Sequence, residues 1–274
     1  MLRKDNFKGH AVATPSLRDL FRSREGYYLV SADYSAAELK ALALLANDTV
    51  LINAFAQGLD VHRMNARDLF GYTRLEDVTN EERDTAKIVV FGMNYGGGYE
   101  TIHGQVAPKY PHITPQMVKL LIQRWYAAHP AIKQWQDMKL QQALDNGYVE
   151  DIMTGARFNF YGDIKVPVVY NFPIQSLVAW RVKKAMKDIA ARLNWETEFI
   201  LMQIHDDIVL EGKSWYRLAR ILKQEMEKPV LINDVDFSFT VEIKIGTNWA
   251  HLVKLSEIMK NVYSSSSNRV LAIK

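Results

Sequence analysis

The hydrophobic positions along the chain predict a small sheet whose strands are separated in sequence by a long helical block. Apolar, aromatic and β-branched residues concentrate in three runs that predict strands, at 27–32, 199–211 and 237–245. Helical patterns lie at 35–46, 81–95, 115–145 with a break near Pro130, 175–193 and 214–228. Strands on both sides of a helical block suit an α+β domain with a helical insertion.

Local sequence signals define the ends of one of these helices and predict two further segments. Thr79 stands three residues before Glu82, which is a capping-box signature for the start of the 81–95 helix, and three glycines from Gly96 end it. Residues 147–160 predict a hairpin around Thr154-Gly155. The last residues, 264–274, open with four serines and predict a mobile tail.

Composition and charge change this picture little. Of 274 residues, 48% are hydrophobic and 24% charged, which is ordinary for a globular protein, and a net charge of +3 is a weak signal for nucleic-acid binding. The absence of cysteine excludes disulfides and thiolate metal sites. Neither a membrane span nor a signal peptide is predicted, so we expect a protein of the cytoplasm, in a cell or in the host of a virus.

The first candidate for chemistry is Asp33, where the first predicted strand gives way to a helix. Side chains at such a junction meet solvent and ligands, so Asp33 is a candidate metal ligand. Aspartate is also a common helix cap, and this segment alone leaves the structural role open.

The second candidate is the acidic pair Asp206-Asp207, which interrupts an apolar strand pattern. Adjacent strand residues point to opposite faces, so we expect only one of them to face a given site. A charge in a strand needs a partner, and a divalent cation is a suitable one. A hairpin turn at Asp206-Asp207 is the alternative, disfavoured because neither residue is Gly or Asn.

Asp33 and Asp206 together predict a carboxylate pair at the ends of neighbouring strands. Hard oxygen ligands suit Mg²⁺, which binds through one or two carboxylates together with substrate phosphates. Two such ions could activate a hydroxyl and stabilise a leaving group. The pattern fits a nuclease as well as a polymerase.

A stripe on the 81–95 helix bears on that choice. Arg83, Lys87, Phe91 and Tyr95 recur every four residues and share one slanted face. Two cations followed by two aromatic rings suit a triphosphate at one end and a base at the other. Taken alone, the stripe is better explained as a surface face that becomes core, which is common for such helices.

These segments together resemble the motifs of family A (polymerase I-like) DNA polymerases. DYSAAEL from residue 33 resembles motif A, RDTAKIVVFGMNYG from residue 83 motif B, and HDD from residue 205 motif C, in the family's order. Five shorter segments agree: DVH at 60–62, HPAIKQW at 129–135, GYVED at 147–151, NFPIQ at 171–175 and GTNWAH at 246–251. The resemblance covers nearly the whole chain and implies a polymerase palm, an antiparallel sheet with helices, carrying a helical fingers insertion.

The resemblance implies template-directed DNA synthesis from dNTPs on a primer-template. Asp33 and Asp206 would hold two Mg²⁺ ions, for which Mn²⁺ can substitute, and the Tyr34 carbonyl would complete one coordination shell. Asp207 would be a supporting catalytic carboxylate where the family usually has Glu. The nucleotide-binding residues implied by the resemblance are Arg83 and Lys87 on the triphosphate, His62 beside them, Phe91 and Tyr95 at the base, and Glu38.

Glu38 has two interpretations. Ser35 and Glu38 have capping-box spacing, which would make Glu38 structural. In the family, a glutamate at this position blocks the ribose 2′-hydroxyl and interacts with the tyrosine matching Tyr95, and we favour that gate. The residues that resemble primer-template contacts are Asn171, Gln175 and His205; minor-groove contacts of this kind check base-pair geometry more than sequence.

Several positions depart from the family pattern by losing positive charge. Asp84 stands where the family commonly has an arginine, a pattern closer to phage-type enzymes. Pro167 stands where the family usually has a second arginine, and the family's Gly-Arg-Arg run appears here as Gly155-Ala156-Arg157. We expect a weaker grip on the template.

The resemblance also divides the chain and implies a partner. We expect palm at 1–65 and 146–255, fingers at 66–145 and a tail at 256–274, with no thumb or exonuclease domain. A second polypeptide carrying the thumb and a 3′–5′ exonuclease would then complete a split polymerase; a shortened form of a longer protein is the alternative. An inactive DNA-binding or assembly subunit is the rival function, and an RNA-making relative is disfavoured by Glu38.

Overall fold

The computed structural model describes residues 16–260, which form two compact units. The sheet unit comprises residues 16–33, 187–225 and 241–260, and the helical unit comprises residues 34–186 and 226–240. Among residues 16–260, no helix is both long enough and apolar enough to cross a bilayer. The predicted tail at 264–274 lies outside the described residues. The division into two compact units does not test the predicted palm and fingers boundaries, which stay predictions.

The sheet unit is built on a five-stranded sheet with the order β4-β5-β1-β8-β9. Its strands are β1 (Tyr28–Tyr34), β4 (Glu198–Ile204), β5 (Asp207–Gly212), β8 (Val241–Gly246) and β9 (Val253–Lys254). β5 pairs antiparallel with both β4 and β1, so strands far apart in sequence become neighbours. Short 3₁₀ turns, η1 (Leu17–Leu20) and η3 (Trp249–His251), lie beside each other.

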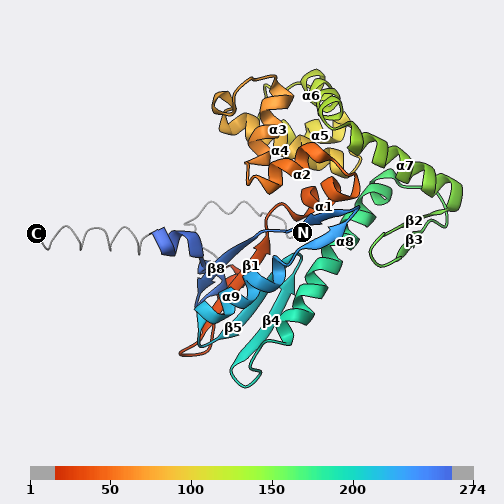
Figure 1. The fold of residues 1–274 in the computed structure, drawn as a ribbon. Helices are drawn as coiled ribbons and strands as arrows, with labels where there is room; N and C mark the ends of the chain where they lie inside the picture. The colour runs from red at the N-terminus through yellow and green to blue at the C-terminus, as the bar shows by residue number, and fades with distance from the viewer. Residues whose placement is uncertain (1–15, 261–274) are drawn as a thin grey trace, which may run out of the picture. The chain divides into compact units, whose positions relative to one another are not determined.

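Helix α9 (Trp215–Met226) packs on this sheet (Figure 1). A Cβ added to Gly212 at the end of β5 would lie 3.0 Å from a methyl of Leu218, so helix and strand are in close contact there. The fully buried residues Ile208, Val209 and Leu210 make β5 the apolar centre of the sheet. Because β5 is closely packed, its backbone holds Asp207, the first residue of the strand, in a fixed position.

The helical unit contains seven complete helices and most of an eighth among the described residues. They are α1 (Ala37–Leu45), α2 (Thr49–Ala56), α3 (Val61–Phe70), α4 (Asn80–Asn94), α5 (Tyr99–Val106), α6 (Pro115–Ala128), α7 (Pro130–Asn146) and α8 (Val166–Ala190), with a 3₁₀ turn η2 (Leu75–Asp77). Two hairpins accompany them, β2 (Tyr148–Glu150) with β3 (Arg157–Asn159), and β6 (Val230–Ile232) with β7 (Val235–Phe237). α4 packs against α3, α5 and α6 (Figure 1), and the buried Val89, Val90 and Trp125 belong to that core.

Most predicted elements are present in the structure. The predicted capping box of α4 is confirmed, because Thr79 Oγ1 accepts from the Glu82 amide and the Glu82 carboxylate accepts from the Thr79 amide. The break at Pro130 and the hairpin at residues 147–160 are also confirmed.

Three predicted elements were wrong in part. The run at 199–211 is a hairpin of two strands rather than one strand, and the run at 237–245 is divided between β7 and β8. α8 begins at Val166, nine residues before the predicted start, and continues through Pro173. Proline lacks the amide proton that a helix interior requires, so a helix that continues through Pro173 is not expected from local preference.

Candidate active site

One end of the β1–β5 pair carries three acidic residues of the sheet unit. Asp33 in β1 lies directly opposite Asp207 in β5. Asp206 lies in the two-residue turn that joins β4 to β5, because the flanking residues Ile204 and Asp207 pair with each other. Directly opposite residues of an antiparallel pair project from the same face, so Asp33 and Asp207 share one face of the sheet.

This turn corrects the argument against a hairpin. The turn residues are His205 and Asp206, one position earlier than the turn considered from the sequence. His205 has a φ of +55°, a left-handed conformation that histidine adopts more readily than most residues. The expectation that only one acid faces a given site was based on strand alternation, and Asp206 is not in the strand.

Asp207 is held by the neighbouring strand residue Ser31. The buried Ser31 hydroxyl lies 2.7 and 2.9 Å from the two carboxylate oxygens of Asp207, to which it donates. Burial raises the pKa of Asp207, and the charge of Asp33 raises it further, while the Ser31 hydrogen bond opposes both. The surroundings of Asp207 therefore disfavour its ionised form beside the charge of Asp33. A cation bound at this edge of the sheet would favour the ionised form instead.

The carboxylates suit a hard divalent cation in their donor chemistry. Among residues 16–260, no group of three or more His, Asp or Glu side chains is placed as a complete metal cage. Mg²⁺ does not require such a cage, because it binds through one or two carboxylates together with water and substrate phosphates. Asp33 and Asp206 could supply that pair.

In the helical unit, α4 presents the predicted stripe and α3 lies beside it. The Arg83 guanidinium makes two hydrogen bonds to the Asp60 carboxylate, at 2.9 and 3.2 Å. Asp60 also caps α3, accepting from the Arg63 amide at 3.1 Å. Burial raises the pKa of Asp60, but the Arg83 and Arg63 hydrogen bonds outweigh it and hold that pKa below its usual value. Arg83 is therefore oriented by a charged partner on the next helix.

Lys87 and Phe91 continue the stripe, with His62 of α3 facing them. Lys87 is exposed, and its Nζ lies 5.9 Å from the centre of the Phe91 ring. The His62 ring lies 6.4 Å from the same ring at a 30° tilt. Burial and the charges of Lys87 and Arg83 lower the pKa of His62 to about 4. His62 is thus a neutral imidazole at pH 7, and its buried Nδ1 has no hydrogen-bond partner among residues 16–260.

Glu38 joins two helices to α1. Its carboxylate accepts a hydrogen bond from the Tyr95 hydroxyl at the end of α4 and another from the Gln175 amide of α8. Burial, followed by the Glu38 hydrogen bond, raises the pKa of Tyr95, so its hydroxyl stays protonated. The capping-box interpretation of Ser35 and Glu38 was wrong, because α1 begins after Ala36, which has a left-handed φ of 53° and no side-chain cap.

The remaining candidates are placed as follows. The Tyr34 side chain is buried, and its hydroxyl donates to the Met226 carbonyl at 2.8 Å. Asn171 in α8 has a buried Oδ1 that finds no hydrogen-bond partner in the described part of the chain, whereas His205 is exposed. An unsatisfied buried acceptor is uncommon and is a position where a ligand could bind.

Two partners of the candidate residues were missed from the sequence. Asp60 could have been found, because it stands two residues before His62 in the DVH segment and precedes a helix, where aspartate commonly caps. Ser31 gave no signal of its own. Its contact with Asp207 depends on the register between strands that are far apart in the chain.

Comparison with known proteins places these features in a family. The family model described as DNA polymerase family A matches residues 6–251. DNA polymerase I of Geobacillus stearothermophilus is 34% identical over 246 residues, and the thermostable DNA polymerase I of Thermus aquaticus is 30% identical over 259 residues. A solved structure, the POL domain of Pol1 from M. smegmatis in complex with DNA primer-template and dNTP, is similar with a TM-score of 0.74 and 25% identity.

The similarity covers most of this chain but a smaller part of each relative. It spans 85% and 89% of this chain against 27% and 30% of the Geobacillus and Thermus proteins, and 85% against 42% of the M. smegmatis chain. The predicted α+β fold of polymerase type is confirmed by that structure and by the antiparallel strand pairs of the sheet. Because the family model matches most of its residues, the chain belongs to DNA polymerase family A.

Proposed function

We propose that this protein adds deoxynucleotides to a primer 3′-hydroxyl as directed by a DNA template. The observation that carries the proposal is the acidic end of the β1–β5 pair, where Asp33 and Asp207 lie opposite each other and Asp206 directly precedes Asp207, in a chain that belongs to a DNA polymerase family. The DNA polymerase I relatives support the same activity. The alternative, an inactive DNA-binding or assembly subunit, has no need of this acidic cluster.

Asp33 and Asp206 would hold two Mg²⁺ ions, with the Tyr34 carbonyl as a further ligand. When bound, such ions would lower the pKa of the primer hydroxyl and neutralise charge on the pyrophosphate leaving group. Ser31 holds the Asp207 carboxylate in place beside this pair. We infer that Asp207, although shorter than Glu, acts as the supporting carboxylate because the register places it opposite Asp33.

Arg83 and Lys87 would bind the triphosphate, and Phe91 would stack on the base. Guanidinium and ammonium groups pair strongly with phosphate oxygens, so the triphosphate would compete with Asp60 for Arg83. The neutral His62 can donate one hydrogen bond to a phosphate without adding a cation to this already positive site. Because the cations precede the aromatic rings along α4, the nucleotide would lie along this helix with its phosphates toward Arg83 and its base toward Tyr95.

We infer that Glu38 selects deoxyribose over ribose. Its carboxylate is fixed by Tyr95 and Gln175, so it cannot swing aside at little cost. A ribose 2′-hydroxyl brought against this fixed group would have to displace one of those hydrogen bonds. Asn171, Gln175 and His205 would contact the primer-template.

We further infer that the grip on DNA comes largely from a thumb, and that a second polypeptide supplies it together with a 3′–5′ exonuclease. Contacts with phosphates supply most of the affinity of a protein for DNA. With a net charge of +3, this chain has few Lys and Arg residues that are not balanced by Asp and Glu, so we expect few such contacts. Isolation of the tagged protein from its source should yield a stoichiometric companion with nuclease activity. Recovery of the chain alone, with tight salt-resistant DNA binding, would contradict this part of the proposal.

Primer extension tests the main proposal. With Mg²⁺, dNTPs and a primer-template, the protein should lengthen the primer by template-matched deoxynucleotides, and Asp33→Ala should abolish the product. Replacing Mg²⁺ by a chelator should also abolish it. An absence of product under every condition would leave only the DNA-binding alternative, and equal extension activity of the parent and Asp33→Ala would show that Asp33 is not part of the site.

A further inference from the structure

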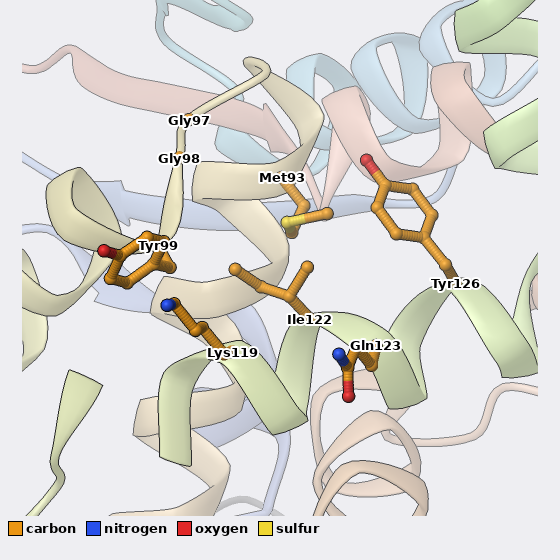
Figure 2. Close-up of a pocket in the computed structure, with 8 residues that line it drawn as sticks. All are labelled: Met93, Gly97, Gly98, Tyr99, Lys119, Ile122, Gln123 and Tyr126. Atoms are coloured by element: carbon orange, nitrogen blue, oxygen red, sulfur yellow. The ribbon is translucent and has the colours of Figure 1, made fainter. Parts of the chain in front are cut away.

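A cavity in the sheet unit has no part in the site described above. It has a volume of about 220 Å³, and all of its lining residues belong to that unit. Two other cavities, by contrast, adjoin the stripe on α4: the one in Figure 2 shares Gly97 and Gly98 with a second that is lined by Phe91 and Tyr95. The cavity in the sheet unit therefore calls for a different explanation.

Helix α9 forms one wall of this cavity and is apolar at its start. Trp215 and Tyr216 line the cavity with their ring centres 5.9 Å apart and their planes at 83°. Tyr216 is 64% exposed, so its ring is open to a binding partner. The buried Ala219 lies one turn further along the same face of α9, and its small side chain leaves room beside the two rings.

The second wall comes from residues that the family model does not match. Leu255 and Met259 line the cavity and lie one turn apart in a helical segment at 255–260, after the last matched residue. The start of this segment is fixed, because β9 pairs antiparallel with β8 and Lys254 forms an ion pair with Glu242 at 2.7 Å. The cavity therefore depends on a part of the chain to which membership of the family assigns no role.

The volume and the charge of the walls indicate what could bind. The cavity is smaller than the range of about 300–1,000 Å³ that is usual for small-molecule sites, so it suits a single apolar side chain. Arg220 and Lys223 are exposed on the α9 wall, and among the described residues no acid lines the cavity. An apolar groove between two helices with cations at its rim is complementary to an amphipathic helix that carries acids beside its apolar side chains.

Two other occupants fit these walls less well. A second copy of this chain, docked through the same face, would bring the cations of both copies together, and like charges oppose such a contact. Single-stranded nucleic acid binds along a track of cations with successive rings on which its bases stack. Here two cations border a cavity that admits one side chain.

We propose that this cavity docks an acidic amphipathic segment of another protein. One apolar side chain of that segment fills the space between α9 and residues 255–260, and its acids pair with Arg220 and Lys223. The inference goes beyond the proposed function and does not rest on it, because none of the lining residues belongs to the nucleotide-adding site.

The first test is the affinity of the full chain for a defined probe, read by fluorescence anisotropy. The probe is a fluorescein-labelled helical peptide with leucine along one face and glutamate beside it. Two comparison peptides carry lysine in place of glutamate or serine in place of leucine. The first peptide should bind about tenfold more tightly than either comparison peptide, a difference of about 1.4 kcal/mol. Equal binding of all three peptides, or binding of none, would overturn the proposal.

Two variants locate the binding on the protein. Arg220→Glu should weaken binding of the acidic peptide about tenfold, because it sets an acid against the acids of the peptide. Met259→Ala should have a similar effect, because it removes one side of the cavity around the bound side chain. The controls are Lys183→Glu, at an exposed position of α8, and Met117→Ala, whose 37% exposure matches the 38% of Met259. Unchanged affinity in Arg220→Glu and Met259→Ala would overturn the proposal.

Photocrosslinking identifies the contact directly. With p-benzoylphenylalanine in place of one leucine of the acidic peptide, adducts should map to the tryptic peptides 214–217 and 255–260, which contain Tyr216 and Met259. Adducts elsewhere would overturn the proposal, as would a dimer that Met259→Ala dissociates or an oligothymidylate whose binding Arg220→Glu abolishes. Adducts at these two peptides in a protein that fails to extend primers would sustain the docking site while rejecting the polymerase function.

Discussion

At the scale of single residues, Glu38 carries the most specific proposal. Its carboxylate is held by Tyr95 from α4 and Gln175 from α8, an arrangement that capping would not require. We expect Glu38→Ala to raise ribonucleotide incorporation relative to deoxynucleotide incorporation by about 10²-fold, the discrimination typical of a site that rejects one hydroxyl. Single-nucleotide incorporation with dNTP and rNTP measures this ratio.

The control for Glu38 is Glu100→Ala, which removes an exposed carboxylate from the neighbouring helix α5. This variant should leave the ratio of ribonucleotide to deoxynucleotide unchanged. If Glu38→Ala also leaves the ratio unchanged while activity persists, the gate is wrong and the network is structural.

His62 makes a prediction about pH. Burial and the nearby cations lower its pKa to about 4, below the usual value of about 6.5, so the folded state binds fewer protons than the unfolded state between these values. Stability linked to His62 is therefore present above about pH 6.5 and is lost as the pH falls toward 4. An NMR titration, with the resonance assigned through His62→Gln, should show a midpoint near 4, and a midpoint near 6.5 would contradict the buried, cation-flanked environment.

At the scale of elements, α4 depends on its first turn to position the stripe. Thr79 and Glu82 satisfy each other's backbone amides there. Thr79→Ala should destabilise the protein by about 1 kcal/mol, which lowers the melting temperature by about 2–4 °C. Calorimetry of this variant and of Thr73→Ala, an exposed threonine in the preceding loop, tests the point. Equal melting temperatures would show that tertiary packing alone holds the start of α4.

The elements also show what could be predicted from the sequence. The start of α4 was predictable because a capping box is a local signal, and the stripe followed from helical spacing alone. The β4–β5 turn was missed because His205 adopts a positive φ without being Gly or Asn. The early start of α8 was missed because Pro173 lies inside it. In both cases the tertiary context overrides a local preference.

In the candidate site, too, local features were predictable from the sequence and long-range contacts were not. Asp33 stood out because it lies where a predicted strand gives way to a helix, and Asp206 because it interrupts an apolar pattern; the family resemblance assigned their role. The Ser31–Asp207 and Glu38–Gln175 contacts join residues 176 and 137 positions apart, so no local pattern could indicate them. Such contacts follow from strand register and helix packing, which only the folded chain defines.

At the scale of the whole molecule, the charge of +3 bears on how the protein meets DNA. With few unbalanced cations, binding of the isolated chain to duplex primer-template should be weak and should have a shallow dependence on salt. Titrations at several salt concentrations measure the slope. A steep slope, equivalent to about six or more phosphate contacts, would show that this chain grips the duplex without help.

The central claim is that the acidic end of the β1–β5 pair is a nucleotidyl-transfer site, and single-turnover incorporation tests it most directly. Protein in excess over primer-template compensates for weak DNA binding, so that one added dNMP reports on chemistry. We predict template-matched addition with Mg²⁺, a loss of at least about 10³-fold in Asp33→Asn and Asp206→Asn, and no loss in Asp236→Asn, an exposed acid of β7. Addition at the parent rate in Asp33→Asn and Asp206→Asn, or no addition by the parent protein, would contradict the account.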